Sequence, residues 1–463
     1  MIGRTLWFMC GLLLATAPAG AQDSRPAPGD VLKEMRALRA RIETLEKQNA
    51  EDRKADRKRI TELESQIETL RTKSLDEERL KEYAEIAQNM RDQQASEGTF
   101  EISPETAGYP NIQNPAITAF FDLGGSISSR GRNEALNRFN LREAEVDIRA
   151  AISPDADGVL ILSIGEEIEQ MRNGQISVDR AFDIEEGYVD FHSLPWDLSL
   201  RVGKMRNHFG RNNPLHTHDL PQVTRPLAVK AFFGGEGMAT TGAALTWLVP
   251  NPWDKFIELR TELVNADGGT ESPILGGPNA ENPAIIARLK YFDDLTETST
   301  LELGTSFLWT RTSDRSDFDA NVFGADVTYQ WIDPDPSTFH SWLLQGELFI
   351  GDNDVPRSAF LSRRNNAWGA YAFGQYQINR NWYAGARFDY TQFPNSELRG
   401  VDDYDIALSP YLTYYMTEFL RLRTQFEHRI SHVRGRNRSE EAVFVQLTFV
   451  IGSHPPHPYW VNR

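Results

Sequence analysis

The chain has 463 residues, enough for several small domains or for one large barrel. Its formal net charge of −17 argues against nucleic-acid backbone as its main partner. Mean hydropathy is −0.48, and no apolar run of about 18 residues follows the N-terminus, which excludes helical membrane spans. These values do not exclude transmembrane β-strands, because such strands are short and only every second residue is apolar.

The N-terminus has the features of a secretory signal peptide over residues 1–21. Arg4 supplies the positive start, an apolar stretch follows, and Ala19-Gly20-Ala21 fits the small-residue cleavage rule, which places the cut before Gln22. The apolar stretch is too short for an uncleaved membrane anchor. The only cysteine, Cys10, lies inside this signal, so we expect a mature chain without disulfides or thiolate metal sites.

A linker over residues 22–29 leads into a charged segment, residues 30–94, that is predicted to be an α-helical coiled coil. Apolar side chains recur there at heptad spacing: Met35, Leu38, Ile42 and Leu45, then Ile60, Leu63, Ile67 and Leu70. Asn49 continues the seam and would help to fix its register. The pattern does not decide whether two or three chains form the coiled coil. The alternative to a coiled coil is a solvated single helix or a disordered charged tract. Residues 95–115, which contain prolines and glycines, are a second linker.

From residue 116 to residue 451 the apolar pattern changes to a period of two, which is typical of β-strands. One segment illustrates the alternation: Leu420, Arg421, Leu422, Arg423. A soluble β-sandwich alternates too. The length of the segments, the full charges on their polar faces and the aromatic residues near their ends favour a transmembrane β-barrel of about sixteen antiparallel strands. Residues 452–463 follow the last strand as a C-terminal tail.

The same pattern predicts the ends of the strands. Short joins such as 379–381 suit periplasmic turns, and longer polar stretches at 265–282, 353–365 and 392–402 suit outer loops. Aromatic residues near strand ends are expected to form girdles at the membrane interfaces: Trp253, Trp309, Trp331, Trp342, Tyr390, Tyr414 and Tyr415.

If the polar faces turn inward, cations line the predicted lumen: Arg149, Arg201, Arg260, Arg288, Lys290, Arg387, Arg421 and Arg423. Carboxylates share these faces: Asp147, Glu258, Glu262, Asp389 and Glu427. Opposed rows of cations and carboxylates create a transverse field that orients dipolar solutes. In the alternative interpretation the charges only pair across strands and stiffen the wall.

Residues 211–237 mix prolines, histidines and apolar residues after a clear strand, an unusual composition for an exposed loop. We expect this segment to fold into the lumen and narrow it, with Arg225 and Lys230 adding positive charge at the constriction. A surface loop that packs on a neighbouring subunit is the alternative.

The sequence contains one short metal-ligand pattern and no catalytic signature. His216, His218 and Asp219 offer three ligands for a borderline metal ion, although short histidine pairs are common in loops. No nucleophile elbow, phosphate-binding glycine loop or zinc-protease motif is present, and pairs such as Glu166-Glu167 fit wet turns better than a glycosidase site. We therefore expect a non-enzyme without a cofactor.

The order of signal peptide, coiled coil, linker and barrel is similar to that of the DcaP-type trimeric porins. Leu200-Arg201-Val202-Gly203-Lys204, followed by His208-Phe209-Gly210, resembles motifs of the phosphate-selective porin O/P superfamily. The resemblance implies a homotrimer, passive diffusion of small polar or anionic solutes, and an inward-folded third loop. The chain departs from the pattern in its tail and in its acidic barrel, which argues against strong anion selectivity.

The leading hypothesis is therefore a diffusion porin of the bacterial outer membrane, in contact with its lipid. The coiled coil would lie in the periplasm, where it either holds a trimer together or reaches towards peptidoglycan or another periplasmic partner. One alternative is a membrane anchor whose coiled coil is the working part. An outer-membrane enzyme such as a lipase or protease ranks last, because no nucleophile stands out. An energised uptake receptor would need a globular plug domain, which the composition of residues 30–94 does not fit.

Overall fold

A computed structural model describes residues 115–130, 137–170, 176–266, 274–276, 283–311, 318–335, 337–358, 361–394, 402–452 and 458–461. The predicted signal peptide, the linkers up to residue 114 and the predicted coiled coil at 30–94 lie outside these residues. Among the described residues, no helix combines the length and apolar character needed to cross a membrane.

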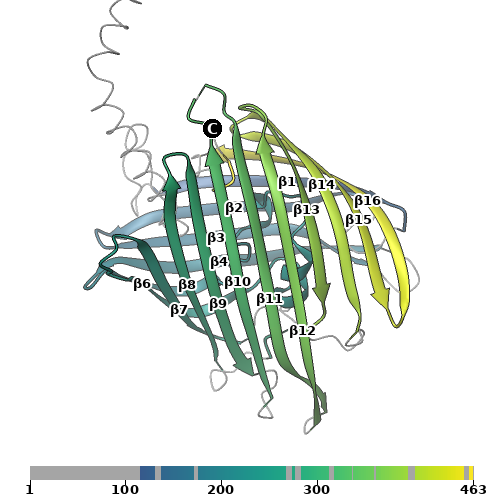
Figure 1. The fold of residues 1–463 in the computed structure, drawn as a ribbon, viewed down its shortest axis with the longest axis horizontal. Helices are drawn as coiled ribbons and strands as arrows, with labels where there is room; N and C mark the ends of the chain where they lie inside the picture. Colours follow the sequence, from purple (N-terminus) through teal and green to yellow (C-terminus); the bar gives the residue numbers. More distant parts are fainter. Residues whose placement is uncertain are drawn as a thin grey trace, which may run out of the picture. The chain divides into compact units, whose positions relative to one another are not determined.

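Sixteen strands in the described part of the chain form one closed antiparallel barrel, as the sequence predicts (Figure 1). Each strand pairs with its neighbours in the sequence, and β16 pairs with β1 from Thr118 opposite Gly452 to Ser128 opposite Ala442. The strands are β1 (Ala116–Ser128), β2 (Phe139–Ser153), β3 (Ala156–Gln170), β4 (Ile176–Leu194), β5 (Leu198–Arg206), β6 (Ala239–Leu248), β7 (Phe256–Val264), β8 (Ala284–Thr296), β9 (Ser299–Arg311), β10 (Asp319–Ile332), β11 (Ser341–Ser358), β12 (Leu361–Gln377), β13 (Trp382–Gln392), β14 (Tyr404–Thr417), β15 (Leu420–Val433) and β16 (Arg436–Gly452).

Polar side chains are buried and large apolar ones are exposed along many strands. In β15, Arg423 is 1% exposed, whereas Phe426, which belongs to the opposite face, is 42% exposed. In β8, Lys290 is 4% exposed and its neighbour Leu289 is 46% exposed. A water-soluble β-protein buries its apolar faces instead. The inverted order is the one expected of a barrel whose outer face meets hydrocarbon.

Aromatic rings stack across neighbouring strands near both strand ends. The pairs are Trp342–Tyr376 (ring centroids 4.6 Å apart) and Trp382–Tyr414 (4.4 Å) near one end, and Trp368–Tyr390 (4.2 Å) and Tyr390–Tyr404 (5.6 Å) towards the other. Within β13, Trp382 and Tyr390 are separated by about 27 Å of strand at ~3.4 Å per residue. That spacing is comparable to the ~25 Å apolar band of an outer-membrane barrel.

Two details of the predicted strand ends are wrong. Tyr415 is 3% exposed and belongs to the buried face, because it alternates with its neighbour Tyr414 and only one of two successive residues can point outward. The stretch 353–365 is mostly strand, since β11 runs to Ser358 and β12 starts at Leu361. Its polar composition does not prevent ladder pairing where a hairpin extends beyond the apolar band.

The largest apolar core lies between the wall and the long connection from β5 to β6. This connection contains the 3-10 helix η1 (Thr217–Asp219) and the short helix α3 (Leu227–Phe233). Its side chains Phe209, Val229, Phe232 and Phe233 belong to one buried cluster with wall residues such as Phe349, Leu308 and Val322. The β5–β6 connection, which contains both polar and apolar residues, thus packs against the buried faces of the strands.

Candidate functional site

The connection between β5 and β6 is almost fully buried. Within residues 211–237 only Gly235 and Glu236 are exposed. Its polar groups bond buried side chains of well-separated strands: Gly210 N to Ser306 Oγ of β9 (3.0 Å), Asn212 N to Glu347 Oε1 of β11 (2.7 Å), Leu227 N to Asp389 Oδ1 of β13 (2.9 Å) and Val223 N to Gln425 Oε1 of β15 (2.9 Å). Wall side chains therefore satisfy backbone amides that a buried loop would otherwise leave without partners.

Seven of the eight cations that were predicted to line the barrel are buried, and Arg149 is half-buried. Six of the eight are paired with carboxylates: Arg149 with Asp147 (2.8 Å), Arg201 with Asp190 (2.6 Å), Arg260 with Glu262 (2.7 Å), Arg288 with Asp326 (2.6 Å), Lys290 with Glu258 (3.2 Å) and Arg387 with Asp389 (2.7 Å). Arg421 and Arg423 donate to the backbone carbonyls of His218 and Leu220. These cations hold the wall and the connection in place.

Arg225 and Lys230 occupy different environments. Arg225 is 3% exposed, and its guanidinium donates to the Asn212 carbonyl (3.1 Å) and to the Leu215 carbonyl (2.8 Å) within the same connection. Lys230 is only half-buried. Both residues line a cavity of about 330 Å³, together with Arg142 and Glu143 of β2. Three of these four side chains are cationic.

Among the described residues, His216 and His218 face two groups of carboxylates that share Glu145, and Asp219 belongs to neither group. His216 Nδ1 lies 3.2 Å from Glu145 Oε2 and 3.0 Å from Glu185 Oε2, and its Nε2 lies 2.8 Å from Glu186 Oε1. The Nε2–Glu186 contact is a charge-assisted hydrogen bond, whereas the two contacts of Nδ1 are ion-pair distances without hydrogen-bond geometry.

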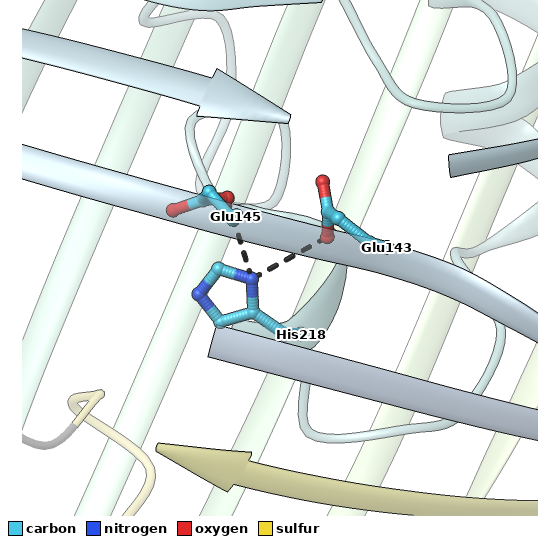
Figure 2. Close-up of side chains that lie close together, drawn as sticks. All are labelled: Glu143, Glu145 and His218. Carbon is cyan, nitrogen blue, oxygen red and sulfur yellow. Dashed lines mark hydrogen bonds and ion pairs between the residues drawn. The ribbon is translucent and has the colours of Figure 1, made fainter. Parts of the chain in front are cut away.

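His218 faces Glu143 and Glu145, as Figure 2 shows. Its Nδ1 lies 3.5 Å from Glu143 Oε2 and 3.6 Å from Glu145 Oε2, so both carboxylates converge on one ring nitrogen. Its Nε2 lies 3.7 Å from Asp219 Oδ2. The ring stacks on Phe120 with centroids 4.3 Å apart, which fixes its orientation.

The carboxylates control the charge of both imidazoles. Burial alone lowers the pKa of His216, but Glu145 and then Glu185 outweigh it and raise that pKa well above its ordinary value. Burial also lowers the pKa of His218, whereas Asp219, Glu145 and Glu143 together raise it to about 9. Arg206, which pairs with Glu185, opposes the rise at His216 without cancelling it.

Several members of this site could not be predicted from the sequence, because β-bulges interrupt the period of two. The register of β2 against β1 skips Arg142, and the register of β4 against β3 skips Glu185. Each bulge places two successive charged residues near the buried side, Arg142 with Glu143 and Glu185 with Glu186. The available signal was a pair of adjacent charges within an otherwise alternating strand.

The C-terminal tail also contacts the buried faces. Trp460 is 2% exposed, and its Nε1 donates to the Asp219 carbonyl at 2.7 Å. The Arg211 guanidinium lies 4.0 Å from the centre of the Tyr459 ring, and the Tyr459 hydroxyl donates to Gln345. The described part of the tail is thus bound to the β5–β6 connection and to β11.

The chain matches no protein-family model. A protein of Aquifex aeolicus (strain VF5), described only as uncharacterized, is 26% identical over 349 residues, which cover 69% of this chain and 70% of that protein.

Several solved structures are similar to the barrel. The outer membrane channel DcaP of Acinetobacter baumannii has a TM-score of 0.49 and 10% identity, and the match covers 74% of this chain and 100% of that one. OprB of Pseudomonas putida has a TM-score of 0.48 and 10% identity, with 73% of this chain and 94% of that one covered. An anion-selective porin from Comamonas acidovorans has a TM-score of 0.47 and 8% identity, with 73% of this chain and 99% of that one covered. At these identities the likeness concerns the fold alone.

Proposed function

We propose that the protein is a porin-type diffusion channel of the bacterial outer membrane that passes small polar or anionic solutes. One observation carries this proposal: a closed barrel of sixteen described strands exposes apolar side chains and buries charged ones. Sixteen strands enclose more space than their own side chains fill, which leaves room for an aqueous path. Charged inward faces keep such a path wet.

We further propose that residues 211–237 fold into the lumen and narrow the path. The contacts of this segment with buried side chains of β9, β11, β13 and β15 support the idea, because these strands occupy separate positions around the barrel. The narrowest part would pass the cavity beside Arg142, Arg225 and Lys230. Cations at a constriction favour anionic solutes even where the rest of the domain is acidic.

The predicted coiled coil at 30–94 would lie in the periplasm and either join three chains or contact a periplasmic partner. Both roles rest on the heptad pattern and on the resemblance to trimeric porins.

Single-channel recording in a planar bilayer under a salt gradient tests the proposal. The purified mature protein should give stepwise conductance, and its reversal potential should report preference for anions. Lys230→Glu should move the reversal potential towards cations, because it reverses a charge beside the cavity. Lys255→Glu is the matched control, since Lys255 pairs with Asp293 (2.5 Å) and does not line the cavity. Absence of conductance from folded, heat-modifiable protein would contradict the channel.

A membrane anchor is the second candidate. The apolar cluster around Phe232 and Phe233 and the buried Trp460 occupy space next to the wall, which favours a barrel that conducts little. An anchor would insert into bilayers and withstand SDS below its unfolding temperature, yet give no current steps.

A further inference from the structure

We propose that Glu143, Glu145 and His218 form a binding site for one divalent metal ion of the zinc type. The site lies where β2 meets the β5–β6 connection, and metal binding there goes beyond the proposed conduction of solutes. The three ligand atoms, one carboxylate oxygen from each glutamate and a ring nitrogen of His218, lie within 4.8 Å of one another (Figure 2).

The spacing of the atoms suits a metal better than a hydrogen bond. His218 Nδ1 is 3.5 Å from Glu143 Oε2 and 3.6 Å from Glu145 Oε2. Hydrogen bonds at such lengths are weak, and an N–H shared between two acceptors points directly at neither. Ligands of a tetrahedral zinc ion with bonds of about 2.0–2.2 Å are separated by about 3.3–3.6 Å, which matches both distances.

A buried carboxylate oxygen supports the site independently. Glu145 is 2% exposed, and its Oε2 lies 3.2 Å from His216 Nδ1 but has no hydrogen bond within the described part of the chain. A buried charged oxygen without such a bond is unfavourable unless another charge compensates it. The same atom lies 3.6 Å from His218 Nδ1, so an ion bound between these two atoms would give the oxygen a direct bond.

The surroundings of His218 fix it as a ligand. Its other ring nitrogen faces the Asp219 carboxylate at 3.7 Å, an arrangement that orients many metal-bound histidines. Its carbonyl accepts from Arg421 and from Arg423 (3.3 Å), and its ring stacks on Phe120. Glu143 and Glu145 are held two residues apart on β2, so both reach the same buried face.

The neighbouring triad of Glu145, Glu185 and His216 is a poorer site. His216 already has hydrogen-bonding distances to carboxylates at both ring nitrogens, and Glu185 receives Arg206 at 2.5 Å. Glu185 therefore already has a cation beside it, and His216 already has a hydrogen bond at Nε2. The three proposed ligands leave the fourth position of a tetrahedral ion open. Glu143 also lines the 330 Å³ cavity, which would give the ion access to the site.

The ligand set identifies the class of ion. One imidazole nitrogen and two carboxylates suit zinc and other borderline divalent ions. Calcium and magnesium prefer six or more oxygen ligands, which these three residues do not provide.

Metal content of the full mature protein in detergent tests the proposal. After chelation, dialysis against zinc and removal of free metal, elemental analysis should find one zinc per chain. His218→Gln and Glu145→Gln should weaken zinc binding at least tenfold, whereas His428→Gln should leave it unchanged. His428 is a matched control, because it pairs with Glu441 at 3.3 Å on the exposed side of the barrel.

Heat-modifiable migration on gels shows whether each variant is folded. If the variants fail to fold, the wild type still decides the question: bound cobalt should give the intense visible absorption of tetrahedral coordination. Wild-type protein that retains no zinc and shows no such cobalt spectrum would overturn the proposal. Loss of zinc in His216→Gln together with full binding in His218→Gln would overturn the assignment to this triad.

Discussion

At the scale of single residues, fully buried ions fasten the β5–β6 connection to the wall. Arg387 has no exposed surface, pairs with Asp389 Oδ2 at 2.7 Å and donates to the Thr224 carbonyl at 2.5 Å. Asp389 in turn accepts from Leu227 N at 2.9 Å, at the start of α3. One ion pair thus supports both a loop carbonyl and the first turn of the helix.

Replacing Arg387 with glutamine should therefore destabilise the barrel by about 3–5 kcal/mol, because it leaves a buried carboxylate without its cation. The midpoint of urea unfolding in detergent measures this change. Arg364→Gln is the control, since Arg364 pairs with Asp352 and Asp354 at an exposed hairpin, where an ion pair contributes at most about 1 kcal/mol. Equal shifts for both variants would show that burial of Arg387 has no energetic importance.

Gly210 has a backbone conformation and a location that exclude a side chain. Its φ is +66°, and a Cβ atom there would overlap the Glu347 carboxylate, which accepts from Arg211 N and Asn212 N. Gly210→Ala should lower the free energy of unfolding by roughly 2–4 kcal/mol, from strain plus overlap. Gly435→Ala should lower it by only about 1 kcal/mol, because Gly435 has a similar φ of +75° with nothing within 4 Å of the added atom. Similar losses in the two variants would contradict the close approach of Glu347.

At the scale of elements, the strands could be predicted from the sequence and the interior contacts could not. Alternation reveals a strand because its two faces meet different surroundings, and β15 with its Arg421 and Arg423 is a clear case. β-Bulges interrupt this alternation, so the positions of Arg142 and Glu185 near the buried side could not be predicted from it. The partners of His218 were also beyond reach, since Glu143 is 75 residues away and only barrel closure brings them together.

The C-terminal tail is another element whose position had no sequence signal. Its aromatic residues Tyr459 and Trp460 pack against Arg211, Tyr383 and Tyr415, all on buried faces. Large rings in this position exclude water from the space they fill.

Trp460→Ala should therefore raise the single-channel conductance of the protein, on the assumption that it conducts. Removing the indole frees the Asp219 carbonyl and opens space beside Arg421, whose guanidinium lies 5.4 Å from the ring centre. Trp253→Ala is the control, because Trp253 is 70% exposed in the turn before β7. Unchanged conductance in Trp460→Ala would place the tail outside the solute path.

At the scale of the whole molecule, the ladder closes among the sixteen described strands themselves. β1 begins at Ala116, and its pairing with β16 and β2 leaves no unpaired strand edge in the barrel. All sixteen described strands lie after the predicted coiled coil at 30–94.

Deletion of residues 30–94, with the predicted signal peptide retained, should accordingly leave a folded, heat-modifiable barrel with the unit conductance of the full chain. On the proposed function, conductance would depend on the wall and the β5–β6 connection, whose described contacts are within residues 116–461. Mass measurement of the detergent complex then separates the two roles proposed for the coiled coil. Monomers would make it the device that assembles the trimer, and intact trimers would make it a tether to a periplasmic partner. Loss of the folded barrel itself would contradict the prediction, because it would mean that the ladder from β1 to β16 needs the N-terminal segment to close.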